Sequence, residues 1–267
     1  MSDYNFRGIL QSDRGIAGTV YVEGRAHVIP DVLQLYGGIQ AWTTRLPTTP
    51  VGEFDFYGGV RATFGPVQFD FGAMYYYYPR ESQVFVLPTA GPVGFGFPTT
   101  QPNGNPLFVP WTVADTDFLE VYGKATWTVN TWLTLSGYLY YADNWLGSGA
   151  YGTYGGGTVK LTAPSSWFPT DFGAYLSGEV AHYWLGTTVP LLGSINLPDY
   201  LYWNVGVAFT YKIFTLDLRY HDTDLTQAQC FTITGDLNGL DTGASPGRSN
   251  WCGEAFIAKL SIDATIK

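Results

Sequence analysis

The chain has 267 residues, of which 46% are hydrophobic and only 13% are charged, and its formal net charge is −9. This charge content is about half that of an ordinary soluble domain, which excludes a typical water-exposed surface. The acidic balance excludes nucleic-acid binding, which needs clustered Lys and Arg. A mean hydropathy of +0.01 excludes a bundle of membrane helices. A transmembrane β-barrel fits all these values, because each strand is apolar toward lipid and polar toward the lumen.

The start of the chain, Met1-Ser2-Asp3-Tyr4, has neither the basic nor the apolar region of a signal peptide. We therefore expect a mature or trimmed form that begins with an added Met. The longest uncharged run, residues 82–114, contains six prolines, which break helical geometry and exclude a transmembrane helix there.

Alternation of apolar and polar residues predicts about twelve antiparallel strands in one domain, residues 1–267. Residues 201–211 show it most clearly, with large apolar residues at the odd positions and smaller or polar residues at most even ones. In chain order the strands are expected at 3–11, 18–29, 32–43, 53–64, 67–78, 116–129, 132–143, 150–163, 172–184, 200–212, 214–225 and 254–266. Most reach or exceed the roughly 9–11 residues that a tilted membrane strand needs.

The connections alternate in length along the chain. Short turns are expected at 30–31, 65–66, 130–131, 164–171 and 213, and longer loops at 12–17, 44–52, 79–115, 144–149, 185–199 and 226–253. Outer-membrane barrels have this pattern of short periplasmic turns and long extracellular loops. The Pro-rich loop 79–115 has three alternative roles: a constriction folded into the mouth, a cover across the rim, or a contact with other cells or subunits.

One face of the expected strands carries no Asp, Glu, Lys or Arg. It includes Val20, Val22, Leu33, Leu35, Phe54, Phe56, Phe69, Phe71, Leu119, Val121, Leu133, Leu135, Val159, Leu161, Leu176, Val180, Phe256, Leu260 and Ile262. Aromatic residues lie toward both ends of this face, as at the two interfaces of a bilayer. His182 is the one residue that does not suit this face, because the register places it outward; it lies near a strand end, where the cost is small.

The opposite face carries the charges and predicts the pore lining. The expected pore-lining residues are Arg7, Glu23, Arg25, His27, Asp55, Arg61, Asp70, Glu120, Lys124, Lys160, Glu179, Asp217, Arg219 and Lys259. Acids and bases nearly balance, which favours ion-pair networks across the lumen. A charge on the lipid face costs about 2–4 kcal/mol at the bilayer midplane, which enforces this sorting.

Cys230 and Cys252 are the two cysteines of the chain. An outer-membrane protein crosses an oxidising periplasm, so we expect a disulfide between them, worth about 3 kcal/mol. Two unpaired thiols are the alternative.

The segment 2–13, SDYNFRGILQSD, resembles the opening of the TorF family of proteobacterial porins. Further similar segments are EFDFYGG (53–59), FLEVYG (118–123), DYLYWNVGV (199–207) and DLRYHDTDL (217–225). The resemblance implies an outer-membrane barrel with a porin function. The chain departs from the family in its long 79–115 loop, in a shorter first strand and in a C-terminus without a terminal aromatic residue.

Little in the sequence indicates catalysis. His27, His182 and His221 share no metal-ligand spacing, and the chain has no GxSxG nucleophile elbow. Glu53 with Asp55, and Glu23 with His27, share a face and suit either acid–base chemistry or a salt-bridge network, which we favour. We therefore expect no enzyme, no metal and no cofactor.

These observations predict a porin-like channel of the bacterial outer membrane for passive diffusion of small solutes or ions. The alternative is a closed barrel that acts as a structural or adhesive surface protein. The expected partners are the lipid bilayer with its lipopolysaccharide and small polar solutes or ions, with no nucleic acid. A homo-oligomer is compatible with the sequence.

Overall fold

A computed structural model describes residues 1–83, 85–86, 109–110, 115–236, 238 and 248–266. Most of the loop predicted at 79–115 and part of the loop predicted at 226–253 lie outside these residues, so the three alternative roles of the first loop are not addressed. Among the described residues, no helix is long and apolar enough to cross a membrane.

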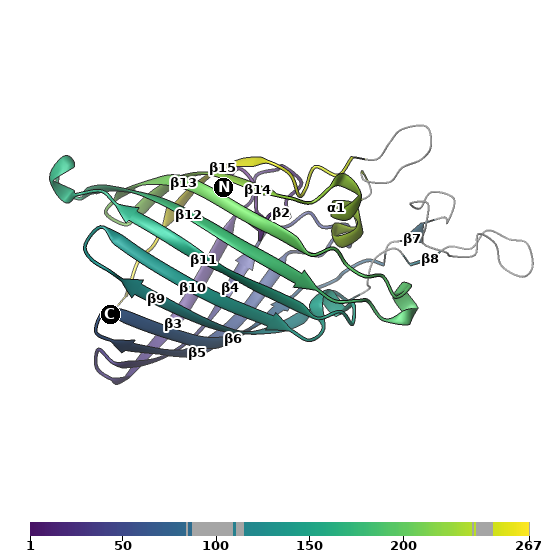
Figure 1. Ribbon diagram of the computed structural model, residues 1–267, viewed down its shortest axis with the longest axis horizontal. Helices are drawn as coiled ribbons and strands as arrows, with labels where there is room; N and C mark the ends of the chain where they lie inside the picture. Colours follow the sequence, from purple (N-terminus) through teal and green to yellow (C-terminus); the bar gives the residue numbers. More distant parts are fainter. Residues whose placement is uncertain (84, 87–108, 111–114, 237, 239–247, 267) are drawn as a thin grey trace, which may run out of the picture.

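Eleven strands form one antiparallel sheet (Figure 1). They are β3 (Thr19–Ile29), β4 (Leu33–Trp42), β5 (Glu53–Phe64), β6 (Val67–Tyr77), β9 (Phe118–Thr128), β10 (Leu133–Ala142), β11 (Gly152–Thr162), β12 (Phe172–Leu185), β13 (Tyr200–Tyr211), β14 (Phe214–Thr223) and β15 (Ala255–Ile262). Each strand pairs with the strands before and after it in this order. The prediction of a mostly β, antiparallel chain is confirmed, and among the described residues eleven of the twelve expected strands lie in the sheet.

The connections are sorted by length between the two ends of the sheet. The connections after β3, β5, β9, β11 and β13 meet at one end, which we call the turn end. The longer connections meet at the other, the loop end, which also carries the short strands β7 (Phe85–Val86) and β8 (Val109–Pro110) and the helix α1 (Gln227–Thr234) (Figure 1). The helix begins with a capping box between Thr226 and Gln229.

The prediction of one strand at residues 3–11 is wrong. These residues form a hairpin of two short strands, β1 (Asn5–Phe6) and β2 (Ile9–Leu10), at whose turn Arg7 and Gly8 have φ angles of 52° and 93°. Glycine adopts such a conformation without steric cost, and it reverses the chain. The alternation in this segment is therefore real, but it belongs to a hairpin that packs inside the curled sheet.

The two edge strands, β3 and β15, run in the same direction, because neighbours alternate along a row of eleven strands. Among the described residues, β3 forms a backbone ladder only with β4, and β15 only with β14. Tyr21 on β3 nevertheless donates a hydrogen bond to Asp263 beyond β15, so the sheet curls until its edges approach. The start of the chain lies at this seam, where the Ser2 backbone N–H donates to the Ala258 carbonyl at 2.9 Å.

The outward face of the sheet is the apolar face that the sequence predicts. Along β13 the odd positions are mostly exposed and the even positions mostly buried. Val180, Leu176 and Phe256 on other strands are exposed by about half or more. A continuous exposed apolar face of this kind requires a lipid surround.

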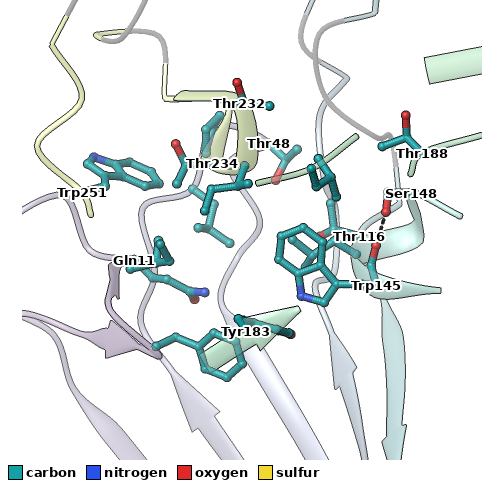
Figure 2. Close-up of a pocket in the computed structure, with 18 of the residues that line it drawn as sticks. Gln11, Thr48, Thr116, Trp145, Ser148, Tyr183, Thr188, Thr232, Thr234 and Trp251 are labelled. Atoms are coloured by element: carbon teal, nitrogen blue, oxygen red, sulfur yellow. Dashed lines mark hydrogen bonds between the residues drawn. The ribbon is translucent and has the colours of Figure 1, made fainter. Parts of the chain in front are cut away.

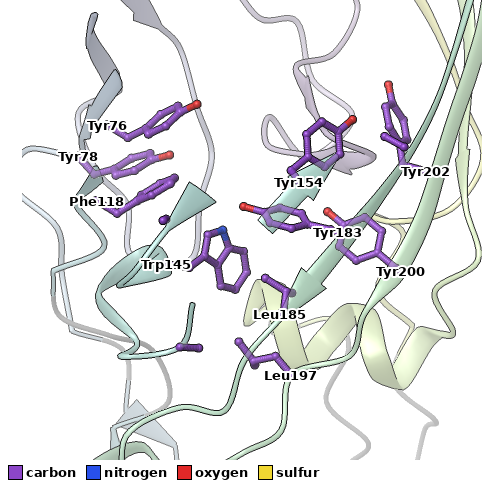
Figure 3. Close-up of a cluster of buried hydrophobic side chains, with 13 residues drawn as sticks. Tyr76, Tyr78, Phe118, Trp145, Tyr154, Tyr183, Leu185, Leu197, Tyr200 and Tyr202 are labelled. Atoms are coloured by element: carbon purple, nitrogen blue, oxygen red, sulfur yellow. The ribbon is translucent and has the colours of Figure 1, made fainter. Parts of the chain in front are cut away.

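The inward face at the loop end is filled by aromatic side chains rather than by an aliphatic core (Figure 3). Tyr76, Phe118, Tyr183 and Tyr200 are almost completely buried there. Tyrosine suits this place because its ring fills space while its hydroxyl group reaches a polar partner.

Candidate functional site

The N-terminal segment (residues 1–16) places Arg7 inside the loop end of the sheet. Both terminal guanidinium nitrogens of Arg7 lie 2.7 Å from the two carboxylate oxygens of Glu120 on β9. The guanidinium also lies over the rings of Tyr140 and Tyr154, at 4.8 and 4.4 Å, and donates to the hydroxyl group of Tyr183 at 3.0 Å. Arg7 was predicted on a wall strand; it lies instead in the β1–β2 turn and contacts β9, β10, β11 and β12.

Tyr4 of the same segment binds the opposite part of the wall. Its hydroxyl group donates to Glu53 on β5 at 2.7 Å, and its ring stacks on Trp42 of β4 with a centroid separation of 4.1 Å. Tyr78 donates to the other oxygen of Glu53 at 3.0 Å. Burial, followed by the charge of Glu53, raises the pKa of Tyr4 and of Tyr78 well above the usual value, so both remain protonated hydrogen-bond donors.

The pair Glu53 and Asp55, which suited acid–base chemistry from the sequence, is buried. Glu53 accepts from Tyr4 and Tyr78, and Asp55 accepts from the Trp42 indole at 3.0 Å. The contact with Tyr4 holds the Glu53 carboxyl group against the N-terminal segment, and Asp55 is held by Trp42, on whose ring Tyr4 stacks. The other suggested pair does not form, because Glu23 binds arginines and His27 lies beside Gln34.

Nearer the turn end, Arg61 links three strands. It contacts Glu23 on β3 at 2.9 Å and Asp70 on β6 at 3.1 Å, and its guanidinium lies 3.7 Å from the centre of the Tyr36 ring. The register places Arg61, Asp70 and Lys124 in one row across β5, β6 and β9, where opposite charges on neighbouring strands stabilise the pairing.

A second polar network lies on β12, β13 and β14. Glu179 accepts hydrogen bonds from Asn204 at 2.8 Å and from Tyr154 at 2.9 Å. Arg219 pairs with Asp217 at 2.9 Å and donates to Asn204 at 2.6 Å. The two networks tie neighbouring strands together through their inward side chains.

Several of the sequence-predicted cations of the inward face remain accessible to water. The Arg25 side chain is 48% exposed although it contacts Glu23, and Lys124 and Lys160 are also exposed. Lys160 and Lys259 lie over the rings of Tyr175 and Trp42, at 4.1 and 5.8 Å. The aromatic side chains at the loop end of the interior are therefore largely buried, whereas exposed charged side chains lie nearer the turn end.

A pocket of about 180 Å³ lies at the loop end and shares Tyr183 and Tyr200 with the aromatic cluster. Its walls come from the N-terminal segment, the 3-10 helix Trp145–Gly147, the connection 186–199 and α1 (Figure 2). We call it the loop-end pocket. No local pattern in the sequence predicts this pocket, because its walls come from connections that lie far apart in the chain.

The predicted disulfide between Cys230 and Cys252 is present, with a Cα–Cα distance of 5.7 Å. It fastens α1 to the segment before β15, beside Leu10 and Trp251. The Leu10 backbone N–H donates to the Trp251 carbonyl at 2.7 Å, so this bridged loop also holds the N-terminal segment.

Three carboxylates at the base of the β6–β9 connection, Glu81, Asp115 and Asp117, each place one oxygen within 4.8 Å of the others. Protein donors already use all three: Thr116 donates to both oxygens of Glu81, the backbone N–H of Tyr78 donates to Asp117, and the backbone N–H of Asp117 donates to Asp115. This group is the one described cluster with the composition of a metal site, and its residues were not singled out from the sequence.

No protein-family model and no curated protein matches the chain by sequence. Solved structures do resemble it. They include OmpT, an outer membrane protein of Vibrio cholerae, with 13% identity and a TM-score of 0.40. The match covers 76% of this chain and 53% of the OmpT chain. A trimer form of OmpT matches with 14% identity over 72% and 54% of the two chains, at a TM-score of 0.35. LpxR from Salmonella typhimurium matches with 10% identity and a TM-score of 0.38. The match covers 78% of this chain and 83% of the LpxR chain.

The chain spans about half the length of the OmpT structures that it matches. At these identities and TM-scores the likenesses concern architecture alone. The outer-membrane localisation predicted from the sequence is confirmed, in agreement with the exposed apolar face of the sheet.

The prediction that the chain is not an enzyme is wrong, because the comparisons do not exclude an enzyme. The structurally similar proteins include an outer-membrane enzyme, LpxR, so an architecture of this kind does not exclude catalysis.

Proposed function

We propose that the chain is an outer-membrane channel for small polar solutes or ions, closed at its loop end by its own N-terminal segment. The strands would form a barrel around a lumen, with the seam between β3 and β15 occupied in part by Met1 and Ser2. In this proposal the chain belongs to the TorF family, and lipid and lipopolysaccharide surround its outward face.

The observation that carries this proposal is the division of the interior into two halves. At the turn end Arg25, Lys124 and Lys160 remain exposed on the inward face, among carboxylates. A barrel filled only for stability has no need of hydrated charges inside it, whereas rings of charged side chains set ion selectivity in pores. The hydrated half therefore favours a conduction path over a solid structural barrel.

The contacts of the N-terminal segment suit a removable closure. Arg7 and Tyr4 bind the wall through an ion pair and hydrogen bonds with Glu120 and Glu53, which water can replace when the segment leaves. The specific SDYNFRG sequence then has a physical role. Tyr4, Arg7 and the turn at Gly8 supply the contacts and the chain reversal of the closure.

Single-channel recording in a planar bilayer tests the proposal. The refolded wild-type chain should conduct in rare steps, and Arg7→Ala should conduct for a larger fraction of the time. Arg80→Ala, which removes an exposed arginine outside the interior, is the matched control and should behave as wild type. If folded wild type and Arg7→Ala are both silent, the channel proposal fails, and the closed structural or adhesive barrel takes its place.

A further inference from the structure

The loop-end pocket has no charged wall. Its described lining contains aromatic and aliphatic side chains, five threonines, one serine and one glutamine, but no Asp, Glu, Lys, Arg or His. Burying an unpaired charge costs far more free energy than burying a neutral polar group. The pocket therefore discriminates against ions, in contrast to the charged interior nearer the turn end.

Two polar atoms of the lining are buried without a hydrogen-bond partner. They are the side-chain carbonyl oxygen of Gln11, an acceptor, and the indole Nε1–H of Trp145, a donor. Both residues are only 7% exposed. In Figure 2 the Gln11 amide and the Trp145 indole approach the floor of the pocket from opposite walls, on either side of the space above Tyr183.

A buried donor and a buried acceptor left unpaired in one pocket are uncommon, since most buried polar groups have partners. The neighbouring side chains do not provide hydrogen-bond partners for these two atoms. Ser148 donates to the Trp145 carbonyl at 2.5 Å, and Thr188 accepts from the Ile195 backbone N–H at 2.9 Å. A ligand that accepts from Trp145 or donates to Gln11 would remove this cost.

The size of the pocket limits the ligand. An apolar protein cavity of about 150 Å³ takes up benzene, and the loop-end pocket measures about 180 Å³. One ring with a short polar substituent fills this volume. A hydroxyl group is the simplest substituent that both donates and accepts.

We propose that the loop-end pocket is a binding site for a neutral, mainly apolar molecule of single-ring size that carries one hydroxyl or amide group. The pocket exists while the N-terminal segment is in place, because Phe6, Ile9 and Gln11 line it, so this proposal does not rest on conduction. A closed barrel would retain it.

The test uses the refolded full chain in lipid nanodiscs and three fluorinated probes observed by ¹⁹F NMR. The probes are 4-fluorobenzyl alcohol, 4-fluorotoluene and 4-fluorobenzoate, with empty nanodiscs of the same lipid to correct for partitioning. The alcohol should bind saturably and more tightly than the toluene, and the benzoate should not bind. Binding of the alcohol that does not exceed the empty nanodiscs, or equal binding of the benzoate, overturns the proposal.

Gln11→Leu tests the polar contact. Because the Gln11 oxygen has no partner in the protein, the variant loses no hydrogen bond through that atom. It should weaken alcohol binding about fivefold, the usual effect of one neutral hydrogen bond, and leave toluene binding equal or tighter. Gln68→Leu, the same change on an exposed residue at the turn end, is the matched control. An unchanged ratio of alcohol to toluene affinity in Gln11→Leu overturns the proposal.

Ile195→Trp tests the location, because the larger ring occupies the pocket. All three probes should then bind no better than to empty nanodiscs, while the protein keeps its heat-modifiable migration on a gel. Retained alcohol binding in a folded Ile195→Trp variant places the site elsewhere and refutes the assignment.

Discussion

Arg7 and Glu120 form a two-point ion pair inside the sheet, 113 residues apart in the chain, with side-chain exposures of 8% and 0%. The pair connects the N-terminal segment to the centre of the wall. Its geometry is the bidentate arrangement in which a guanidinium and a carboxylate bind most strongly. Removing one partner leaves the other charge buried and unpaired, which gives the first prediction.

Arg7→Ala should lower the free energy of unfolding by about 3–5 kcal/mol, the usual cost of breaking a buried ion pair from one side. The double variant Arg7→Ala/Glu120→Ala should recover part of this loss, because no unpaired carboxylate remains. Urea unfolding of the refolded protein, followed by its migration on a gel, measures both. Glu120→Ala completes the cycle, and a loss in the double variant equal to the sum of the two single losses would mean that the two residues are not coupled.

Arg61→Gln should shift ion selectivity toward cations, because it removes a positive charge that Glu23 and Asp70 now balance. The reversal potential across a salt gradient measures the shift, in the wild-type chain and in Arg7→Ala. Arg219→Gln on β14 should act in the same direction. Arg80→Gln provides the comparison, and unchanged reversal potentials in both interior variants would remove these arginines from the pore lining.

Replacing Cys230 and Cys252 by Ala should destabilise the chain by about 3 kcal/mol, because the disulfide closes a loop with a sequence separation of 22. The loss should appear first in the N-terminal segment, since Leu10 is held by the Trp251 carbonyl beside the bridge. Hydrogen exchange of the Leu10 amide measures this local effect. A reducing agent should reproduce it in the wild type and change nothing in the double variant.

Val159→Lys and Thr158→Lys test which face of β11 contacts lipid. Val159 is exposed on the apolar face, and Thr158 is its neighbour on the opposite face. A lysine on the lipid face costs about 2–4 kcal/mol near the bilayer midplane, so Val159→Lys should fold into vesicles much less efficiently than Thr158→Lys. Folding yields in the reverse order would mean that the sheet is turned the other way.

Much of the wall could be predicted from the sequence. The exposed residues of β13 and the inward Arg61 and Asp70 follow from alternation alone, because successive side chains of a strand point to opposite faces. The disulfide was predictable because Cys230 and Cys252 are the only cysteines.

The N-terminal segment shows the limit of that reasoning. Alternation in residues 3–11 suits a wall strand and a hairpin equally, and only the buried partners of Arg7 decide between them. The glycine at position 8 was the available signal for this reversal, because glycine adopts positive φ without steric cost. The helix α1 had a similar local signal in its Thr226–Gln229 capping box.

The sequence by itself determined the class of the protein, its two-faced strands and the order of its short and long connections, because these depend on local periodicity and on the solvent that each face meets. Only the tertiary structure decided what fills the interior and where a pocket lies. Arg7 with Glu120, and Gln11 with Trp145, come from segments far apart in the chain, and no local pattern encodes the distance between them.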